Sequence, residues 1–386
     1  MAGLCLLTFS SRTRSSILAP CHNLLLQQAN EFASVAGEAS ARADETGMID
    51  RGVWTAFHDT GLSLAAFDPE FGGKGLGAPD QQQTLCAVLR LVGAANLSVA
   101  RILEGHVNAI MLVSRYGTAT QIAALAEDVK RGELSGVWGA EDAQGLKRIA
   151  LGAEWSLEGR KILASGAGFV TRPVVPVMTS EGHVMYLLDL PQGERVDVSG
   201  WKPLGMKATA SGAVDLTGIS VGVREQIGAA GAFTRQPFFS GGAWRFCAAQ
   251  LGAMERLASL YGEHLRSRGR DKDPYQLERV AQCAAACGTA HFWIEEASRR
   301  FGADALEPQS VVAFANLTRM VTERAALEVM ERVQKGIGLT SFMSGHPAER
   351  VSRDLATYLR QPVPDQAMSD AAKAVLSGDL SIGATF

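Results

Sequence analysis

Cysteine, excess basic charge and long apolar runs are all scarce in this sequence. The formal net charge is -3 over 386 residues, so a dense Lys/Arg surface for nucleic acid is not expected. The six cysteines lie mostly within apolar helical stretches, which favours free, buried thiols in a reducing, cytoplasmic compartment over a disulfide framework. Cys283 and Cys287 are one helical turn apart, but no second Cys/His pair accompanies them, so no metal site is predicted. No apolar run approaches the roughly 20 residues of a membrane-spanning helix.

The patterning predicts a short leader and three domains. Residues 1–19 hold a brief apolar patch followed by Arg12 and Arg14, the reverse of a secretory signal, and are expected to be a flexible leader. Apolar residues at three- and four-residue steps predict a helical domain over 20–136. Short apolar stretches between Gly and Pro predict a β domain over 137–232, and the helical period then returns over 233–386. The expected strands are 155–163, 174–177, 184–188 and 213–221, and the expected long helices are 244–265, 276–300 and 311–333.

This order of elements is α+β and excludes a doubly wound fold. No strand and helix alternate as βαβ units do. The glycine cluster from Gly72 to Gly77 is therefore not a dinucleotide fingerprint, because no strand precedes it, and it predicts a loop between helices.

Several segments carry a resemblance when they are taken in order. Phe67-Asp-Pro-Glu-Phe-Gly-Gly-Lys-Gly is followed by Gly132-Glu-Leu-Ser-Gly-Val-Trp-Gly-Ala-Glu-Asp and by Leu157-Glu-Gly-Arg-Lys-Ile-Leu-Ala-Ser-Gly. Arg266-Ser-Arg-Gly-Arg comes next, and then Gln334-Lys-Gly-Ile-Gly with Pro347-Ala-Glu-Arg-Val-Ser-Arg-Asp-Leu. Over nearly the whole chain these segments resemble the acyl-CoA dehydrogenase superfamily of flavoproteins. The last pair is the most specific, since the family has Gln-x-x-Gly-Gly followed by Pro-x-Glu-Arg-x-x-Arg-Asp.

The resemblance implies an N-terminal helical domain, a central antiparallel β barrel or sandwich, a C-terminal four-helix bundle, and assembly as a homodimer or homotetramer. It also implies FAD between the β domain and the bundle, with FMN or reduced flavin from a reductase as the alternative. Ala140 and Ser165 each stand where the family has a Thr, and Leu163 replaces its Trp; the Ser-Gly ending is closer to the reduced-flavin monooxygenases of the superfamily. Arg268 matches the Arg that meets the FAD pyrophosphate of a neighbouring subunit, and a guanidinium suits phosphate. The residues implied at the cofactor are Ala140, Leu163, Ser165, Arg268, Gln334, Gly336, Gly338 and Arg353.

The catalytic base of a dehydrogenase is the weak point of the resemblance. Most members carry a Glu nine residues after the Arg of Arg-Asp, and here Pro362 occupies that position. The alternative family position, near Ser240, also lacks a carboxylate. Asp365 is the nearest acid and becomes the candidate base, while His106 and His346 are further candidates for acid–base work.

Three hypotheses follow from this sequence. The first is an FAD-dependent oxidoreductase acting on the Cα–Cβ bond of an acyl-CoA or related small molecule, with a non-standard base and electron-transfer flavoprotein as its partner. The second is a two-component monooxygenase that receives reduced flavin from a flavin reductase and needs no such base. The third is a degenerate scaffold that keeps only the fold.

Overall fold

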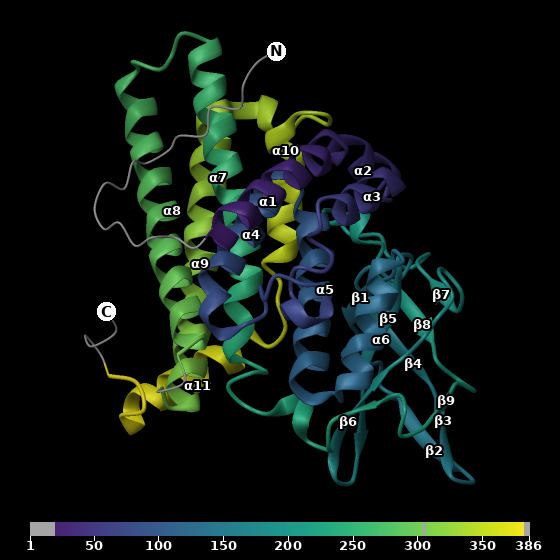
Figure 1. Ribbon diagram of the computed structural model, residues 1–386. Coiled ribbons are helices and arrows are strands. Elements are labelled where there is room, and N and C mark those ends of the chain that lie inside the picture. The colour runs from purple at the N-terminus through teal and green to yellow at the C-terminus, as the bar shows by residue number, and fades with distance from the viewer. Residues whose placement is uncertain (1–19, 304–305, 382–386) are drawn as a thin grey trace.

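The computed structural model describes residues 20–303 and 306–381, so the predicted leader, 1–19, lies outside the described residues. A helical N-terminal part and a longer helical C-terminal part pack side by side, and the strands lie together on one side of them (Figure 1). This arrangement confirms the predicted order of helices, strands and helices.

The N-terminal part is built around a long apolar helix. Asn96 ends α4 and begins α5, since its side chain accepts a hydrogen bond from Val99 N–H at 3.2 Å. By length and composition α5 could cross a membrane, but 67% of its apolar window is buried inside the protein, where it serves as a core helix. The helices of this part are α1 (Pro20–Glu38), α2 (Ser40–Thr46), α3 (Arg51–Asp59), α4 (Gln82–Ala95), α5 (Leu97–Tyr116) and α6 (Ala119–Lys130).

The strands form three small sheets. The first has the order β1-β5-β6-β10, the second β2-β3-β9 and the third β4-β8-β7. Pairing is antiparallel except between β1 and β5, which run parallel, so the sheet is not wholly antiparallel as predicted. The strands are β1 (Leu134–Val137), β2 (Lys147–Leu151), β3 (Glu154–Glu158), β4 (Arg160–Ala164), β5 (Val170–Thr179), β6 (Gly182–Leu187), β7 (Val196–Asp197), β8 (Gly212–Asp215), β9 (Ser220–Val221) and β10 (Gln226–Ile227).

Two strands predicted as continuous are each divided between two sheets. The predicted strand 155–163 breaks at Gly159, whose φ of +115° only glycine adopts readily, into β3 and β4. The predicted strand 213–221 breaks in the same way into β8 and β9. Local alternation reports a strand but not the sheet to which it belongs.

Three long helices dominate the C-terminal part, and all three were predicted. They are α7 (Trp244–Ser267), α8 (Pro274–Phe301) and α9 (Pro308–Ile337), followed by the 3-10 helix η6 (Gly338–Phe342), α10 (Pro347–Tyr358) and α11 (Pro364–Ser377). Arg353 and Asp354 lie in the middle of α10, which begins at Pro347.

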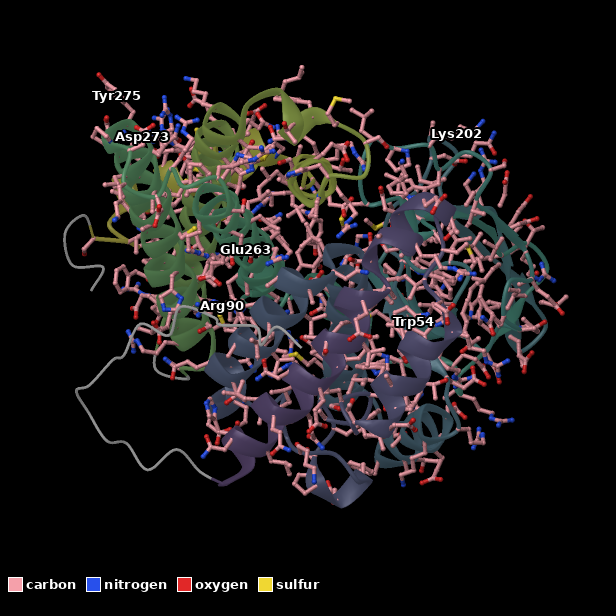
Figure 2. All side chains as sticks on the ribbon, turned by 90° about the horizontal axis from the view of Figure 1, so that it is seen from above. Trp54, Arg90, Lys202, Glu263, Asp273 and Tyr275 are labelled. Carbon is pink, nitrogen blue, oxygen red and sulfur yellow. The ribbon has the colours of Figure 1, made fainter. Side chains whose placement is uncertain are left out.

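Glycines allow α4 and α7 to approach closely. A Cβ on Gly93 would lie 2.2 Å from the carbonyl oxygen of Ala249, and one on Gly252 would lie 2.1 Å from that of Arg90. Arg90, labelled in Figure 2, also donates to the carboxylate of Glu255 at 2.6 Å. The two helical parts therefore share one core, in which the four cysteines whose side chains are described are free and buried, as expected.

Candidate functional site

The chain that follows β1 is held in place by one buried lysine. Lys161 on β4 is fully buried, and its Nζ donates to the carbonyl oxygen of Pro176 at 2.6 Å and to the carboxylate of Glu141. Burial lowers the pKa of Lys161, and the hydrogen bond that its ammonium donates to Glu141 opposes that shift. In the same segment, the carbonyl of Ala140 accepts from Ile162 N–H at 3.0 Å. Lys161 thus fixes Ala140, a predicted cofactor residue, against β4.

Next to Ala140, β4 carries a bulge. Its pairing with β8 is interrupted between Lys161 and Ala164, and Leu163 there adopts a φ of +51° with 62% of its surface exposed. A left-handed conformation is costly for leucine, and such bulges are common beside functional sites. Ser165 follows; its carbonyl accepts from the indole N–H of Trp138 at 3.1 Å, and its hydroxyl has no partner among the described residues. The structure therefore brings together Ala140, Leu163 and Ser165, and we call this group the strand-edge face.

The strand-edge face fits the polar edge of a flavin ring. It offers an exposed backbone at Ala140, a free hydroxyl at Ser165 and an exposed apolar side chain at Leu163. A hydroxyl can donate to or accept from the ring's polar atoms, and an apolar side chain can cover its carbon face. Lys161, which the sequence prediction passed over, positions this face from beneath; a lysine at a strand interior was the available signal.

A buried polar cluster lies on α5, the helix that packs under the turn after Ser165. A Cβ on Gly166 would lie 3.5 Å from Ile102 of α5, so the helix packs directly under the turn after Ser165. Two residues further along, the buried carboxylate of Glu104 accepts from Asn108 at 2.7 Å, from the hydroxyl of Tyr358 at 3.2 Å, and from Arg101.

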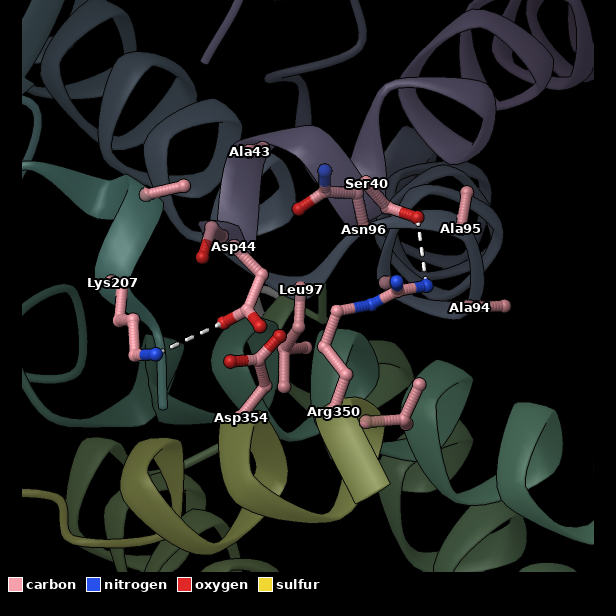
Figure 3. Close-up of a pocket in the computed structure, with 14 residues that line it drawn as sticks. Ser40, Ala43, Asp44, Ala94, Ala95, Asn96, Leu97, Lys207, Arg350 and Asp354 are labelled. Carbon is pink, nitrogen blue, oxygen red and sulfur yellow. Dashed lines mark hydrogen bonds and ion pairs between the residues drawn. The ribbon is translucent and has the colours of Figure 1, made fainter. Parts of the chain in front are cut away.

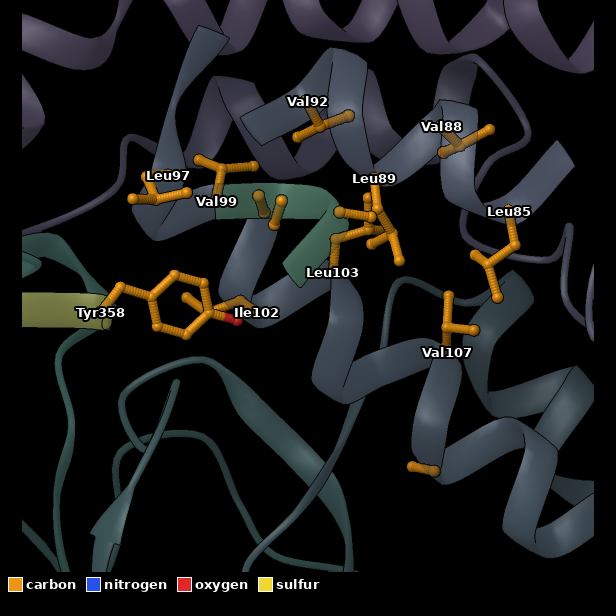
Figure 4. Close-up of a cluster of buried hydrophobic side chains, with 14 of the residues drawn as sticks. Leu85, Val88, Leu89, Val92, Leu97, Val99, Ile102, Leu103, Val107 and Tyr358 are labelled. Carbon is orange, nitrogen blue, oxygen red and sulfur yellow. The ribbon is translucent and has the colours of Figure 1, made fainter. Parts of the chain in front are cut away.

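Tyr358 brings the α10 tail into this cluster. Its ring reaches α5 beside Ile102 (Figure 4), and burial, together with the charge of Glu104, raises the pKa of its hydroxyl. The sequence analysis did not identify the cluster, although an Arg and a Glu inside an otherwise apolar helix were a visible signal.

The Arg353-Asp354 pair of α10 serves as a structural clamp. Arg353 donates to Asp44 of α2, to Glu349 one turn earlier, and to the carbonyl of Leu204. These five hydrogen bonds use all of its donors, so it has none left for a ligand, and its predicted cofactor role stays a prediction. Asp354 accepts from the backbone N–H of Met206, and burial raises its pKa to about 6.

Figure 3 shows a small cavity beside this clamp. Asp44 pairs with Lys207 there at 3.9 Å, and Arg350 donates to the hydroxyl of Ser40 at 2.9 Å. The side chains that line the cavity are thus already engaged with one another, and they join α2, α10 and the loop before β8.

The remaining predicted cofactor residues lie elsewhere. Arg268 caps the C-terminus of α7 and is exposed in the turn before α8. Asp273 and Tyr275, at the start of α8, lie on the opposite side of the molecule from Lys202 of the β domain (Figure 2). The turn between α7 and α8, which holds Arg268, lies far from β4 and its strand-edge face (Figure 1). The role of Arg268 at the cofactor of an adjoining copy stays a prediction.

Gln334, Gly336 and Gly338 end α9 near that turn. A Cβ on Gly336 would lie 2.3 Å from the ring of Tyr261, and Gly338 has a φ of +81°. Helix packing explains the glycine at position 336, and helix termination explains the glycine at position 338. Gln334 is half-buried. A cofactor role for these three residues stays a prediction.

The candidate acid–base residues are not gathered at the strand-edge face. Asp365 is exposed in the first turn of α11, which packs on α9 on the side away from the sheets (Figure 1). His106 accepts from Ser135 N–H at 3.0 Å and donates to the carbonyl of Ser63 at 2.8 Å, and burial lowers its pKa to about 4. His346 caps α10 by accepting from Ala348 N–H. Both histidines are structural.

Within the ranges 20–303 and 306–381, no group of three or more His, Cys, Asp or Glu side chains is placed to hold a metal ion.

Comparisons with known proteins agree with the fold. Residues 20–133 match the family model for the acyl-CoA dehydrogenase N-terminal domain. A comparison with curated protein sequences finds no match. Among solved structures, TdsC of Paenibacillus sp. A11-2, a dibenzothiophene monooxygenase, is 20% identical with a TM-score of 0.79, covering 94% of this chain and 99% of that one.

Two further solved structures share the fold. The methanesulfinate monooxygenase MsuC of Pseudomonas fluorescens is 19% identical with a TM-score of 0.78, covering 93% of this chain and 98% of that one. Butyryl-CoA dehydrogenase of Megasphaera elsdenii is 16% identical with a TM-score of 0.81, covering 93% and 99%. At these identities the likeness shows the fold alone. With the match of residues 20–133, the chain is similar to acyl-CoA dehydrogenases in its N-terminal domain and in its overall fold.

Proposed function

We propose that this protein is a two-component monooxygenase that takes reduced flavin, FMN or FAD, from a partner reductase and oxygenates a small molecule. The observation that carries the proposal is the engagement of the carboxylates near the strand-edge face. Glu141 is paired with buried Lys161, and Glu104 is held by Arg101, Asn108 and Tyr358. A dehydrogenase needs a carboxylate free to remove a proton from its substrate, whereas an oxygenation does not.

The comparisons lend the proposal further support. Two of the solved structures with this fold are titled as monooxygenases, and TdsC has been solved with FMN and indole. Ser165, followed by glycine, also resembles the reduced-flavin monooxygenases of the superfamily. Butyryl-CoA dehydrogenase shares the fold as well, so acyl-CoA oxidation is the competing function that the experiment must separate.

In the proposed reaction, each part of the chain has a limited task. Lys161 and the bulge at Leu163 hold the strand-edge face in position, and the Ser165 hydroxyl orients the polar edge of the flavin. The flavin supplies the activation of O₂. The buried Glu104 cluster joins α5, the helix that packs under the turn after Ser165, to Tyr358 of α10. Arg268 is proposed to meet the flavin of an adjoining copy in a homodimer or homotetramer.

The test compares two reactions of the same purified protein. Reduced FMN or FAD is bound under anaerobic conditions, O₂ is admitted with candidate substrates, and incorporation of isotopically labelled oxygen is measured. In parallel, protein loaded with oxidised FAD is mixed anaerobically with acyl-CoA. Oxygen incorporation without bleaching by acyl-CoA supports the proposal, while bleaching by acyl-CoA would overturn it.

A matched pair of variants locates the flavin. Ser165→Ala should weaken flavin binding about tenfold through loss of one hydrogen bond in a partly buried site. Ser220→Ala, on exposed β9 of another sheet, is the control and should leave binding unchanged. Equal flavin affinity in both variants would remove Ser165 from the site.

A further inference from the structure

A buried arginine at the start of α7 has two side-chain nitrogens without a hydrogen-bond partner among the described residues. Arg245 is 7% exposed, and its Nε and Nη1 atoms make no hydrogen bond within the described part of the chain. Buried charges are normally paired, because an unpaired one is strongly unfavourable.

The backbone makes room for this side chain. A Cβ on Gly242 would lie 2.1 Å from Nη2 of Arg245, so only glycine leaves space for the guanidinium. The guanidinium carbon lies 5.0 Å from the ring centre of Phe301 and 5.7 Å from that of Trp244. The charge therefore lies in an apolar, aromatic surrounding that contributes cation–π contacts but no anion.

The nearby acid does not neutralise it. Glu104 is the acidic group whose charge acts on Arg245, and it is already bonded by Arg101, Asn108 and Tyr358. Two arginines thus share one carboxylate, and Arg115 adds to the positive field at Arg245. The cluster has one positive charge in excess. Arg245 stays charged at neutral pH, although burial lowers its pKa to about 10.

We propose that Arg245 binds the acid group of a compact organic anion, a carboxylate or a sulfinate, which is the substrate of this site. The inference rests on the proposed oxygenase function. A planar guanidinium suits two oxygens of such a group, and the rings of Trp244 and Phe301 suit its apolar body. The charge of Glu104 on α5 acts on Arg245, and α5 packs through Ile102 under the turn after Ser165, so this helix links the proposed anion site to the strand-edge face.

The experiment measures binding to the full chain without flavin. Each anionic probe is paired with a neutral molecule of the same shape: methanesulfinate with dimethyl sulfoxide, and benzoate with benzamide. Calorimetry and thermal unfolding are recorded in a buffer of constant chloride concentration. The expected result is that at least one anion binds at least tenfold more tightly than its neutral counterpart. Equal binding within both pairs, or no binding by either anion, would overturn the proposal.

Three variants localise the binding. Arg245→Met should lose the anion preference at least tenfold, and Arg245→Lys should keep part of it. Arg256→Met removes an arginine of the same helix that is paired with Glu263, and should bind like the unaltered protein. An anion preference that survives in Arg245→Met would contradict the assignment. Should Arg245→Met fail to fold, Arg245→Lys and the anion–neutral comparison still decide.

These results are separable from those of the proposed function, because binding needs neither flavin nor oxygen. Anion binding that depends on Arg245, without oxygen incorporation, refutes only the monooxygenase. Oxygen incorporation without such binding refutes only the anion site.

Discussion

Replacing Arg245 by methionine should stabilise the ligand-free protein. The buried guanidinium has a pKa lowered from 12.5 to about 10, chiefly by burial, which corresponds to about 3 kcal/mol against the charged form in the fold. Methionine has a similar length and no charge. It forfeits the contacts with Trp244 and Phe301, which are worth about 1 kcal/mol together. The expected net gain in the free energy of unfolding is therefore about 1–3 kcal/mol.

Urea unfolding followed by circular dichroism measures this gain through a higher midpoint at an unchanged slope. Glu104→Gln provides the internal check, since it removes the anion that stabilises both Arg101 and Arg245. Glu104→Gln alone should lower the free energy of unfolding by about 2–4 kcal/mol. In the Arg245→Met background the same change should cost less, by at least ~1 kcal/mol. A lower midpoint for Arg245→Met, or strict additivity of the two changes, would refute the view that Arg245 is an uncompensated charge.

Other predictions follow from single sites. The pKa of Asp354 is raised to about 6, so ionisation of this carboxyl destabilises the fold as the pH rises from about 4 to 6. Asp354→Asn should therefore raise the free energy of unfolding by about 2 kcal/mol at pH 7 and leave it unchanged at pH 4. Urea unfolding at the two pH values measures the difference. The pKa of His106 is lowered to about 4, so the stability that its neutral imidazole contributes is present above about pH 6.5 and is lost as the pH falls through 4. His106→Gln should flatten the dependence of the free energy of unfolding on pH over that range. Leu163→Gly should relieve the strain of the left-handed backbone at this position and raise the free energy of unfolding of the flavin-free protein by about 1 kcal/mol. The same change should weaken flavin binding. A lower free energy of unfolding would argue against strain at Leu163. Arg268→Ala should reduce flavin retention on dialysis without changing the unfolding midpoint, since the side chain is exposed.

Much of the fold was predictable because local patterns report burial. Apolar residues at helical spacing predicted α7, α8 and α9, and the alternation from Trp155 to Leu163 predicted strand structure where β3 and β4 lie. The division of two predicted strands between sheets was not predictable, because alternation does not encode pairing partners. The sequence could not decide whether Asp365 is a catalytic base. Only the position of α11 shows that Asp365 is exposed and lies away from the strand-edge face.

By itself, the sequence determined the three-part architecture, the flavoprotein resemblance and the replacement of the usual Glu by Pro362. Tertiary structure alone decided which charges are neutralised. Arg353 meets Asp44 across 309 residues, and Tyr358 meets Glu104 across 254. Nε and Nη1 of Arg245 find no such partner among the described residues. The physical reason is that the free energy of a buried charge depends on atoms within a few ångströms, and these are brought there by folding from segments that have no fixed spacing along the chain.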